Sequence, residues 1–387
     1  MLSSVSERHA ALALWENDFE WVQAPDVRYA DPHVEGARAT TYRARSWESP
    51  VVELDWAARE LIPSWNARTP AGTWLEVEGR VSDERGWSPW FTFARWAEDD
   101  VAGESPITRT SVPGQSFEAG HVEADSWVAA ADHEFGRWQL RLTALAGAGD
   151  EQPWPDVSLV AAVATRVSIG HDEPTSAPGV GRGLEVPVPA HSQRLHVDSF
   201  PHWDDGGQSW CSPTSTTMIL AHWGLAPSAA ESAWVGHDTD PEVVHGVRRV
   251  FDRDYGGAGN WSFNTAYAGA RGLRAYVTRL RDLTEVEAFL AAGVPLVLSV
   301  TFREEELDGA GYSTKGHLLV VVGFTPDGDV ISNDPNSHRV ADNEQVRTVY
   351  RRDQFEKVWL GTDGGLAYVM HPRNVALPTA PAEANWA

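Results

Sequence analysis

Residues 316–335 read GHLLVVVGFTPDGDVISNDP, two apolar runs joined by the turn TPDGD. An Asp-Gly pair between apolar runs is a strong signal for a β-hairpin, and it predicts an antiparallel sheet in this half of the chain. The hairpin places His317 at the start of one strand, and Asn333 and Asp334 at the end of the next. Because antiparallel neighbours bring these two ends together, the imidazole is expected to meet Asp334, with Asn333 as the alternative. The residue counts on the two sides of the turn are unequal, so the pairing requires a bulge or a turn after the second strand.

The rest of the C-terminal half alternates between helical and strand patterns. Helices are expected at 211–224, 264–272 and 283–293. Strands are expected at 273–280, 295–302, 316–324, 330–335 and 365–370, and a strand leading into a helix at 346–359. Thr284 followed by Glu287 predicts a capping box at the start of the helix over 283–293. Helices first and an antiparallel sheet afterwards indicate an α+β fold.

The N-terminal half has a different pattern, with short alternating strands and turn clusters between residues 40 and 169. Strands are expected at 73–81, 136–145 and 158–170. Several such strands with little helical periodicity predict an antiparallel β-sandwich of the jelly-roll type. A short helix is expected within the first 20 residues, over SERHAALALWE.

A chain of 387 residues is longer than one ordinary core, which favours two domains. The segment HDEPTSAPGVGRG at 171–183 is polar and rich in Gly and Pro, so it is interpreted as a linker. The expected division is a β-sandwich accessory domain at 1–170, the linker, and an α+β domain at 184–387.

Composition restricts the partners. The formal charge of −24 argues against nucleic acid and against anionic membrane surfaces, and no apolar run of about 18 residues predicts membrane insertion. The first 20 residues lack a basic region followed by an apolar core, so no signal peptide is recognised. A cytoplasmic location is therefore favoured, with a leaderless or mature secreted form as the alternative.

A single cysteine, Cys211, excludes an intramolecular disulfide and a cysteine-rich zinc site. The segment HDTDPEVVH at 237–245 is interpreted as a solvated loop entering a helix, so no metal and no cofactor are predicted. A lone cysteine is more often a packed residue than a nucleophile. Cys211, however, follows the Gly-rich segment DDGGQSW and precedes Pro213, and proline is tolerated in the first turn of a helix.

A helix N-terminus favours a thiolate over a thiol, and its free N–H groups can stabilise an oxyanion. A thiolate nucleophile also needs a base and a group that orients the base. The hairpin supplies both, with His317 as the base and Asp334 or Asn333 as the orienting group. The combination of Cys211 with this hairpin favours nucleophilic chemistry over simple packing.

Four ordered blocks carry a resemblance to a known family: GGQSWCSPTSTTMILAHWG, GNWSFNTAYAGARGLRAYVTRL, GHLLVVVGFTPDGDVISNDP and VRTVYRRDQFEKVW. In this order they resemble family thirty-nine of the cysteine peptidases, in its C39-like branch, over about residues 184–372. The resemblance implies a papain-like fold. It also implies Cys211 as the nucleophile, His317 as the general base and Asp334 as the orienting acid.

The oxyanion donor departs from the pattern of papain-like enzymes. These enzymes usually carry a glutamine six residues before the cysteine, where this chain has Asp205. Gln193 resembles the glutamine element of the family, with an insertion before Cys211, and is favoured over Gln208.

Three further residues are candidates for substrate binding: Trp210, Asn260 and Trp261. Asn260 and Trp261 lie in the Gly-rich loop GGAGNWSF, which is interpreted as a wall of the substrate groove. The alternative is that this loop is only a structural turn. The N-terminal half resembles accessory β-sandwich modules of bacterial extracellular enzymes. Such modules can bind a glycan through exposed aromatic rings, and the candidates are Trp87, Trp90 and Trp96, with core packing as the more common role.

Together these features predict a cysteine peptidase that cleaves an amide bond of a peptide or protein substrate through an acyl-enzyme. Two alternatives remain open at this stage. The same three residues could transfer the acyl group to an amine or thiol instead of water. The chain could also be a non-catalytic glycan- or ligand-binding protein built on a peptidase scaffold.

Overall fold

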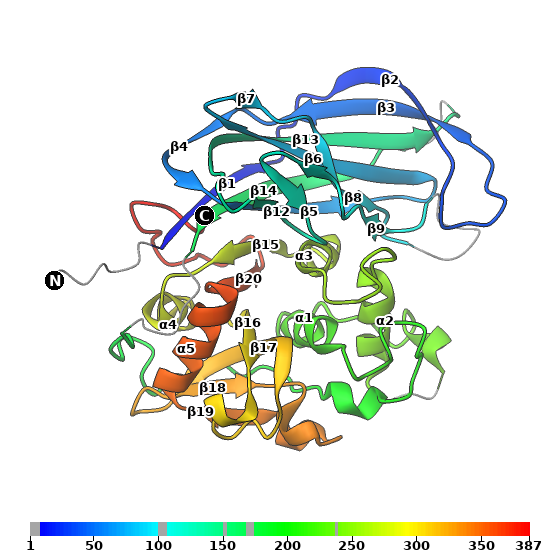
Figure 1. Cartoon of the computed structure of the whole chain (residues 1–387). Coiled ribbons are helices and arrows are strands. Elements are labelled where there is room, and N and C mark those ends of the chain that lie inside the picture. Colours follow the sequence, from blue (N-terminus) through cyan, green and yellow to red (C-terminus); the bar gives the residue numbers. More distant parts are fainter. Residues whose placement is uncertain (1–7, 100–106, 150–152, 168–173, 237–238) are drawn as a thin grey trace.

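The computed structural model describes residues 8–99, 107–149, 153–167, 174–236 and 239–387. The N-terminal region up to residue 167 consists of β-strands in two sheets, and the remainder combines helices with a third sheet (Figure 1). Both predicted fold classes are confirmed at this level.

Most strands of the N-terminal region are long, and the short ones lie between residues 86 and 129. They are β1 (His9–Glu16), β2 (Val22–Tyr29), β3 (Thr40–Glu48), β4 (Val52–Ala58), β5 (Glu60–Arg68), β6 (Thr73–Asp83), β7 (Gly86–Trp87), β8 (Phe91–Trp96), β9 (Thr110–Ser111), β10 (Ser116–Phe117), β11 (Gly120–Val122), β12 (Trp127–Ala129), β13 (Phe135–Gly147) and β14 (Asp156–Arg166).

The two sheets of this region form a sandwich with nested strand pairing. One sheet has the order β1-β14-β5-β12-β11-β10, and the other has the order β2-β3-β13-β6-β8-β9, with β4 on β13 and β7 on β6. The pairing runs inward from the ends, β1 with β14, β3 with β13, β5 with β12 and β6 with β8, and successive pairs alternate between the sheets. This is the connectivity of a jelly roll.

The predicted helix near the N-terminus is wrong. Residues His9–Glu16 form β1, which pairs with β14 along its whole length, from His9 opposite Arg166 to Glu16 opposite Leu159. The Ala and Leu residues of this segment have high helix propensity, but propensity is a weak preference that tertiary pairing overrides. The long-range partner strand was not visible from the local pattern.

The C-terminal region has five α-helices and six strands among its described residues. The helices are α1 (Cys211–His222), α2 (Pro241–Val250), α3 (Trp261–Ala270), α4 (Leu283–Ala291) and α5 (Arg352–Asp363). The strands are β15 (Arg274–Arg279), β16 (Leu296–Phe302), β17 (Thr314–Phe324), β18 (Val330–Asn333), β19 (Arg347–Tyr350) and β20 (Leu366–His371). The short 3-10 helices are η1 (Gln193–His196), η2 (Ala233–Val235), η3 (Glu304–Glu306), η4 (Ser337–Arg339) and η5 (Asn343–Gln345). The strands form one antiparallel sheet in the order β15-β20-β16-β17-β18-β19, as an α+β fold requires.

The predicted capping box of α4 is also wrong. Asp282 caps this helix, and its carboxylate accepts from the backbone N–H groups of Thr284 and Glu285. Glu287 turns inward instead and forms a buried ion pair with Arg352, at 2.6 Å between Oε1 and Nη1. A capping box needs the glutamate to turn back on its own helix, whereas here a buried arginine attracts it.

The described part of the predicted linker, residues 174–183, lies against α4 and α5. The backbone N–H groups of Gly179 and Gly181 donate to Glu287 Oε2 at 2.8 and 2.9 Å. The Ser176 hydroxyl donates to Glu356 at 2.7 Å. This segment is therefore fixed to the C-terminal region by partly buried and buried hydrogen bonds.

The two regions share an interface in which α3 and β15 lie beside the sheet that contains β5 and β14 (Figure 1). The side chain of Asn66 on β5 pairs with the backbone of Ala275 in both directions, at 2.7 and 3.0 Å. A Cβ atom on Gly269 would lie 2.4 Å from the Asn66 carboxamide, so the glycine permits this close approach. Trp65 packs edge to face with Phe263 of α3. The N-terminal region therefore fixes the position of α3.

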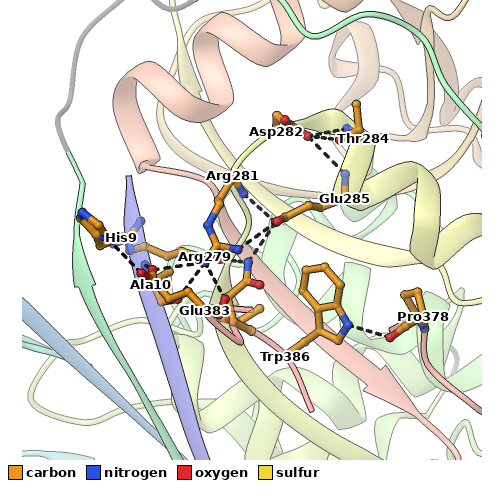
Figure 2. A network of polar contacts seen from close by, with 12 residues as sticks. His9, Ala10, Arg279, Arg281, Asp282, Thr284, Glu285, Pro378, Glu383 and Trp386 are labelled. Atoms are coloured by element: carbon orange, nitrogen blue, oxygen red, sulfur yellow. Dashed lines mark hydrogen bonds and ion pairs between the residues drawn. The ribbon is translucent and has the colours of Figure 1, made fainter. Parts of the chain in front are cut away.

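The C-terminal tail contacts both regions through a network of polar contacts (Figure 2). Glu383 accepts a hydrogen bond from the backbone of Ala10 at 2.9 Å and pairs with Arg281 at 3.2 Å. Asn385 is fully buried, and the Trp386 side chain is 4% exposed. These contacts connect β1 with the start of α4 through the tail.

Among the described residues, every helix is too short or too polar to cross a lipid bilayer.

Candidate active site

Cys211, His317 and Asp334 come together at the junction of α1 with the third sheet. Cys211 is the first residue of α1 and His317 lies in β17. His317 Nε2 is 2.7 Å from Asp334 Oδ1, and the imidazole also interacts with the thiol of Cys211. Both Cys211 and His317 line a cleft of about 620 Å³. A thiol at a helix N-terminus and an imidazole thus line one cleft, and a buried carboxylate lies behind the imidazole.

The register of the hairpin explains how His317 reaches Asp334. Val320 of β17 pairs with Asn333 of β18, and a bulge lies between Val321 and Gly323. Asp334 follows directly after β18, and its backbone turns, so that its side chain reaches His317. The bulge or turn that the unequal residue counts required is therefore present.

Asp334, and not Asn333, is the partner of His317. The Asn333 side chain donates to the carbonyl oxygen of Val188 at 3.1 Å, away from the imidazole. Asp334 is fully buried, and its carboxylate accepts hydrogen bonds from four donors. Apart from His317 these are the backbone N–H of Asn336 at 2.9 Å, the hydroxyl of Tyr312 at 2.8 Å and the hydroxyl of Tyr350 at 2.5 Å.

Sequence reasoning did not identify the two tyrosines. Tyr312 precedes β17 and Tyr350 ends β19, so neither is near Asp334 in sequence. Both lie in the C-terminal half close to or within quoted family blocks, but no local spacing connects them to a carboxylate. Their hydroxyls fix the orientation of Asp334 and neutralise part of its charge by donation.

The electrostatics of the pair favour an imidazolium beside a carboxylate. Burial favours the neutral imidazole, but the charge of Asp334 and the hydrogen bonds to Asp334 and Cys211 raise the pKa of His317 to about 10. Burial also opposes ionisation of Asp334, yet His317 and the hydrogen bonds from Tyr350 and Asn336 lower its pKa. The two groups therefore stay oppositely charged across neutral pH.

Gln193 and Gln208 both line the cleft, but they are engaged differently. The Gln193 amide nitrogen donates to the carbonyl oxygens of Gly207 and Gln208, at 3.0 and 2.9 Å, and its Oε1 is buried without a hydrogen-bond partner. Gln208 is exposed, and its Oε1 accepts from Arg194 at 2.6 Å. Both amide hydrogens of Gln193 are thus used by the loop that leads to Cys211, whereas the Gln208 amide nitrogen makes no such contact.

This difference predicts which glutamine would donate a hydrogen bond to an oxyanion. We expect Gln208→Ala to lower kcat with little change in KM, since loss of one oxyanion donor costs about 100-fold or more. We expect Gln193→Ala to loosen the 206–208 loop and to lower thermal stability as well. Steady-state kinetics and a thermal melt on both variants separate the two cases. A kcat loss confined to Gln193→Ala at unchanged stability would reverse the assignment.

The loop before Cys211 approaches Gln193 closely. A Cβ on Gly207 would lie 2.1 Å from the backbone oxygen of Gln193, so only glycine fits there. Close packing against Gln193 therefore explains why the segment before Cys211 is rich in glycine. Asp205, which stands where papain-like enzymes carry their glutamine, is exposed.

Of the three predicted substrate-binding residues, only Trp261 lines the cleft. Trp210 is fully buried, and its indole nitrogen donates to the Trp203 carbonyl at 2.7 Å, so its predicted position in the groove is wrong. Asn260 is also buried and caps α3 by accepting from the Phe263 N–H. Both side chains satisfy local backbone groups instead of facing a substrate.

The N-terminal region contributes to the wall that carries Trp261. Asp125, in the turn between β11 and β12, accepts a hydrogen bond from the Trp261 backbone N–H at 3.0 Å. The neighbouring Ala124 carbonyl accepts from the Asn260 amide at 3.2 Å. Burial raises the pKa of Asp125 to about 7, although the bond from Trp261 opposes the shift. The β-sandwich therefore holds the start of α3 at the cleft.

The tryptophans proposed as a glycan platform are either buried or in contact with arginine side chains. Trp96 is fully buried in the core, so its predicted exposure is wrong. Trp87 and Trp90 are half-buried, and the Arg80 guanidinium lies 4.6 and 4.4 Å from their ring centroids. Arg141 lies 4.4 Å from the Trp90 ring. Cation–π contacts account for these rings, and a glycan ligand stays a prediction.

The segment 237–245 has its first two residues outside the described part of the chain. Its later residues begin α2, where His245 is buried with Nδ1 3.1 Å from the Tyr267 hydroxyl. Asp240 joins two other side chains whose ligand-type atoms lie within 4.8 Å of one another, and the group is His191, Asp240 and Glu242. His191 Nδ1 lies 3.4 Å from Asp240 Oδ2, so an ion pair accounts for the grouping. The absence of a metal stays a prediction.

Two family models match the chain. Residues 10–165 match the Peptidase C39 N-terminal domain, and residues 186–366 match the Peptidase C39 like family. No curated protein matches.

Among solved structures, a protein from Bacillus anthracis assigned as a C39-like peptidase is 17% identical, with a TM-score of 0.29. That similarity covers 49% of this chain and 99% of the other. A structure of infectious bursal disease virus, Gx strain, is 10% identical with a TM-score of 0.14, covering 41% of this chain and 40% of the other. TM-scores this low add nothing to the family matches. The chain is thus built from a Peptidase C39 N-terminal domain followed by a domain of the C39-like peptidase family.

Proposed function

We propose that this protein is a cysteine peptidase that hydrolyses an amide bond of a peptide or protein through an acyl-enzyme. The observation that carries the proposal is the buried bond of 2.7 Å between His317 and Asp334, with the Cys211 thiol on the other side of the imidazole. A packed structural cysteine would need neither partner. The match to the C39-like peptidase family supports the same reading.

The geometry gives each residue a role in the first half of the reaction. Because Nε2 is bound to Asp334, Nδ1 of His317 faces Cys211, and at rest the imidazole already holds the proton of the thiol, as an imidazolium beside a thiolate. The Cys211 thiolate forms a bond to the carbonyl carbon of the scissile amide, and the carbonyl oxygen becomes an oxyanion. The Cys211 backbone N–H, at the start of α1, and the Gln208 amide stabilise that charge. His317 then donates its proton to the leaving nitrogen as the carbon–nitrogen bond breaks.

Water completes the cycle. The thioester carbon is attacked by a water molecule, whose proton passes to His317. The carbon–sulfur bond then breaks, releasing a carboxylic acid and restoring the Cys211 thiolate beside the protonated imidazole. Transfer to an added amine would leave an amide product instead, so the product masses with and without amine identify the acceptor.

The test is the rate at which iodoacetamide alkylates Cys211. We expect His317→Ala to slow this rate at neutral pH by about 100-fold or more, because the thiolate loses its imidazolium partner. Cys211→Ala should take up no label and cleave no peptide from a random peptide library. His222→Ala, on the far end of α1, serves as the matched histidine control and should alkylate at the unsubstituted rate. Equal rates for His317→Ala and the unsubstituted protein would overturn the proposal.

A further inference from the structure

The cleft beside Cys211 is more cationic than the protein around it. The whole chain has 31 basic and 55 acidic residues, a net charge of −24. The charged side chains that line the cleft are, besides His317, three cations and two carboxylates: Arg194, Lys315, Arg339, Asp204 and Asp363. Lys315 is one of only two lysines in the sequence. A cleft whose charge opposes that of the protein attracts anionic ligands selectively.

Arg194 and Arg339 line the same cleft because their two segments are hydrogen-bonded to each other. The Gln193 backbone N–H donates to the Pro335 carbonyl at 3.0 Å, which joins η1 to the turn that carries η4. His338 and Arg339 both have left-handed backbone, with φ of 48° and 56°. This conformation is costly for residues other than glycine and is retained where the surrounding structure or the function requires it.

No acid among the described residues neutralises this arginine pair. Arg194 donates to Gln208 at 2.6 Å, and its Nε is buried without a hydrogen-bond partner. Burial lowers the pKa of Arg194, and the positive charge of Arg339 lowers it further. Arg194 is partly buried and Arg339 is exposed, so the two cations can be reached by a ligand in the cleft. A carboxylate is the group that bidentate arginines bind best.

Among the described residues, neither carboxylate of the cleft forms an ion pair with Arg194 or Arg339. Asp204 accepts from the Ala258 N–H at 3.0 Å, and its charged neighbour is Asp205, which together with burial raises its pKa. Asp363 accepts from the Thr362 hydroxyl at 2.9 Å. On the side of Asp204, Tyr255 and Trp261 also line the cleft. The carboxylates of the cleft are therefore engaged by other groups, and the two arginines face the cleft without an acidic partner among the described residues.

We propose that Arg194 and Arg339 bind a carboxylate of the peptide substrate, which makes the enzyme selective for peptides that carry an acidic group near the scissile bond. This inference rests on the proposed peptidase function and specifies its substrate class. The carboxylate can belong to an acidic side chain or to a peptide C-terminus, since both present the same group to a guanidinium pair.

Chloroacetamide-capped peptides test the proposal, because they alkylate Cys211 and report recognition as a second-order rate. One series carries Glu, Gln or Lys, each as a C-terminal amide, at the first, second or third position from the electrophile. A further Gln series has a free C-terminal carboxylate. The rate of each peptide is divided by the iodoacetamide rate of the same variant, which removes differences in thiol reactivity.

At one or more positions, we expect a Glu peptide or the free-carboxylate peptide to react about tenfold faster than its neutral Gln match, as one charge-assisted hydrogen bond implies. Arg339→Glu should abolish this preference and favour the Lys peptide. Arg38→Glu, an exposed arginine on the β-sandwich, makes the same charge change and should keep the preference. Faster reaction of the Glu amide identifies a side-chain site, and faster reaction of the free-carboxylate Gln peptide identifies a C-terminal site.

Two kinds of failure are distinguishable. If all peptides react equally while iodoacetamide labelling still depends on His317, the inference is wrong and the proposed function stands. If Arg339→Glu and Arg38→Glu change the preference equally, the effect arises from net charge and the inference is wrong. If iodoacetamide labelling does not depend on His317, the proposed function itself fails.

Discussion

Asp334→Asn is expected to lower kcat/KM by about 100- to 10,000-fold, because it removes the charge that holds His317 protonated and oriented. In the unsubstituted protein the pKa of His317 is raised to about 10, against an opposing effect of burial. Without the carboxylate, burial dominates and the imidazole loses its proton at lower pH. In the unsubstituted protein, the rate of Cys211 alkylation should change near pH 10, where His317 loses its proton. In Asp334→Asn, the same change should occur closer to neutral pH.

Neighbouring substitutions provide the controls for this prediction. Asn333→Ala should leave the profile unchanged, since the Asn333 side chain bonds to Val188 and not to His317. Tyr350→Phe removes one donor to Asp334 but keeps the carboxylate, so its effect should be smaller than that of Asp334→Asn. A profile that shifts in Asn333→Ala but not in Asp334→Asn would contradict the assignment.

The same pair contributes to stability in a defined pH range. The folded-state pKa of His317 lies above its usual value of 6.5, so the stabilisation is complete below about pH 6.5 and is lost as the pH rises through about 10. A fall in the free energy of unfolding over this alkaline range, absent in Asp334→Asn, is the measurement that checks it.

Glu287→Gln is expected to be the most destabilising single change outside the cleft, at about 3–5 kcal/mol, because it leaves a buried arginine without its counter-charge. The Glu287 side chain is fully buried and that of Arg352 is 6% exposed. Glu287 also accepts from the backbone of Gly179 and Gly181, so the substitution should release the segment 174–183. Urea unfolding gives the change in free energy, and limited proteolysis at 174–183 reports the release.

A double substitution separates the ion pair from its surroundings. Glu287→Leu combined with Arg352→Met removes both charges at similar volume and should recover part of the stability lost in Glu287→Gln. Glu305→Gln, an exposed glutamate of the same region, should change the free energy of unfolding by less than about 0.5 kcal/mol. A loss in Glu287→Gln no greater than that of Glu305→Gln would show that the pair does not stabilise the fold.

Local pattern was informative wherever the structure depends on near neighbours in sequence. The hairpin at 316–335, the helix that starts at Cys211 and the alternating strands β6 and β13 follow from periodicity and turn chemistry. The same reasoning failed for β1, whose partner β14 is about 150 residues away. It also failed for Glu287, which suits a helix cap locally but pairs with Arg352.

The candidate site, like the fold, could be predicted from local sequence pattern only in part. Spacing in the hairpin brought His317 near residues 333 and 334, but it could not choose between them, because successive side chains at a strand end point in different directions. The sequence analysis also placed Trp210 in the groove, and Asn260 with it as part of a Gly-rich loop. Their side chains instead satisfy buried backbone groups, a requirement that depends on what packs around them.

By itself the sequence determined the two fold classes, the position of Cys211 at a helix start and the hairpin that carries its partners, since these depend on backbone periodicity and turn residues. Only the tertiary structure decided that Asp334 holds His317, that Tyr312 and Tyr350 hold Asp334, and that Arg194 and Arg339 line one cleft. These contacts join side chains from separate segments. Their distances are set by how the sheet and helices pack, which no local pattern encodes.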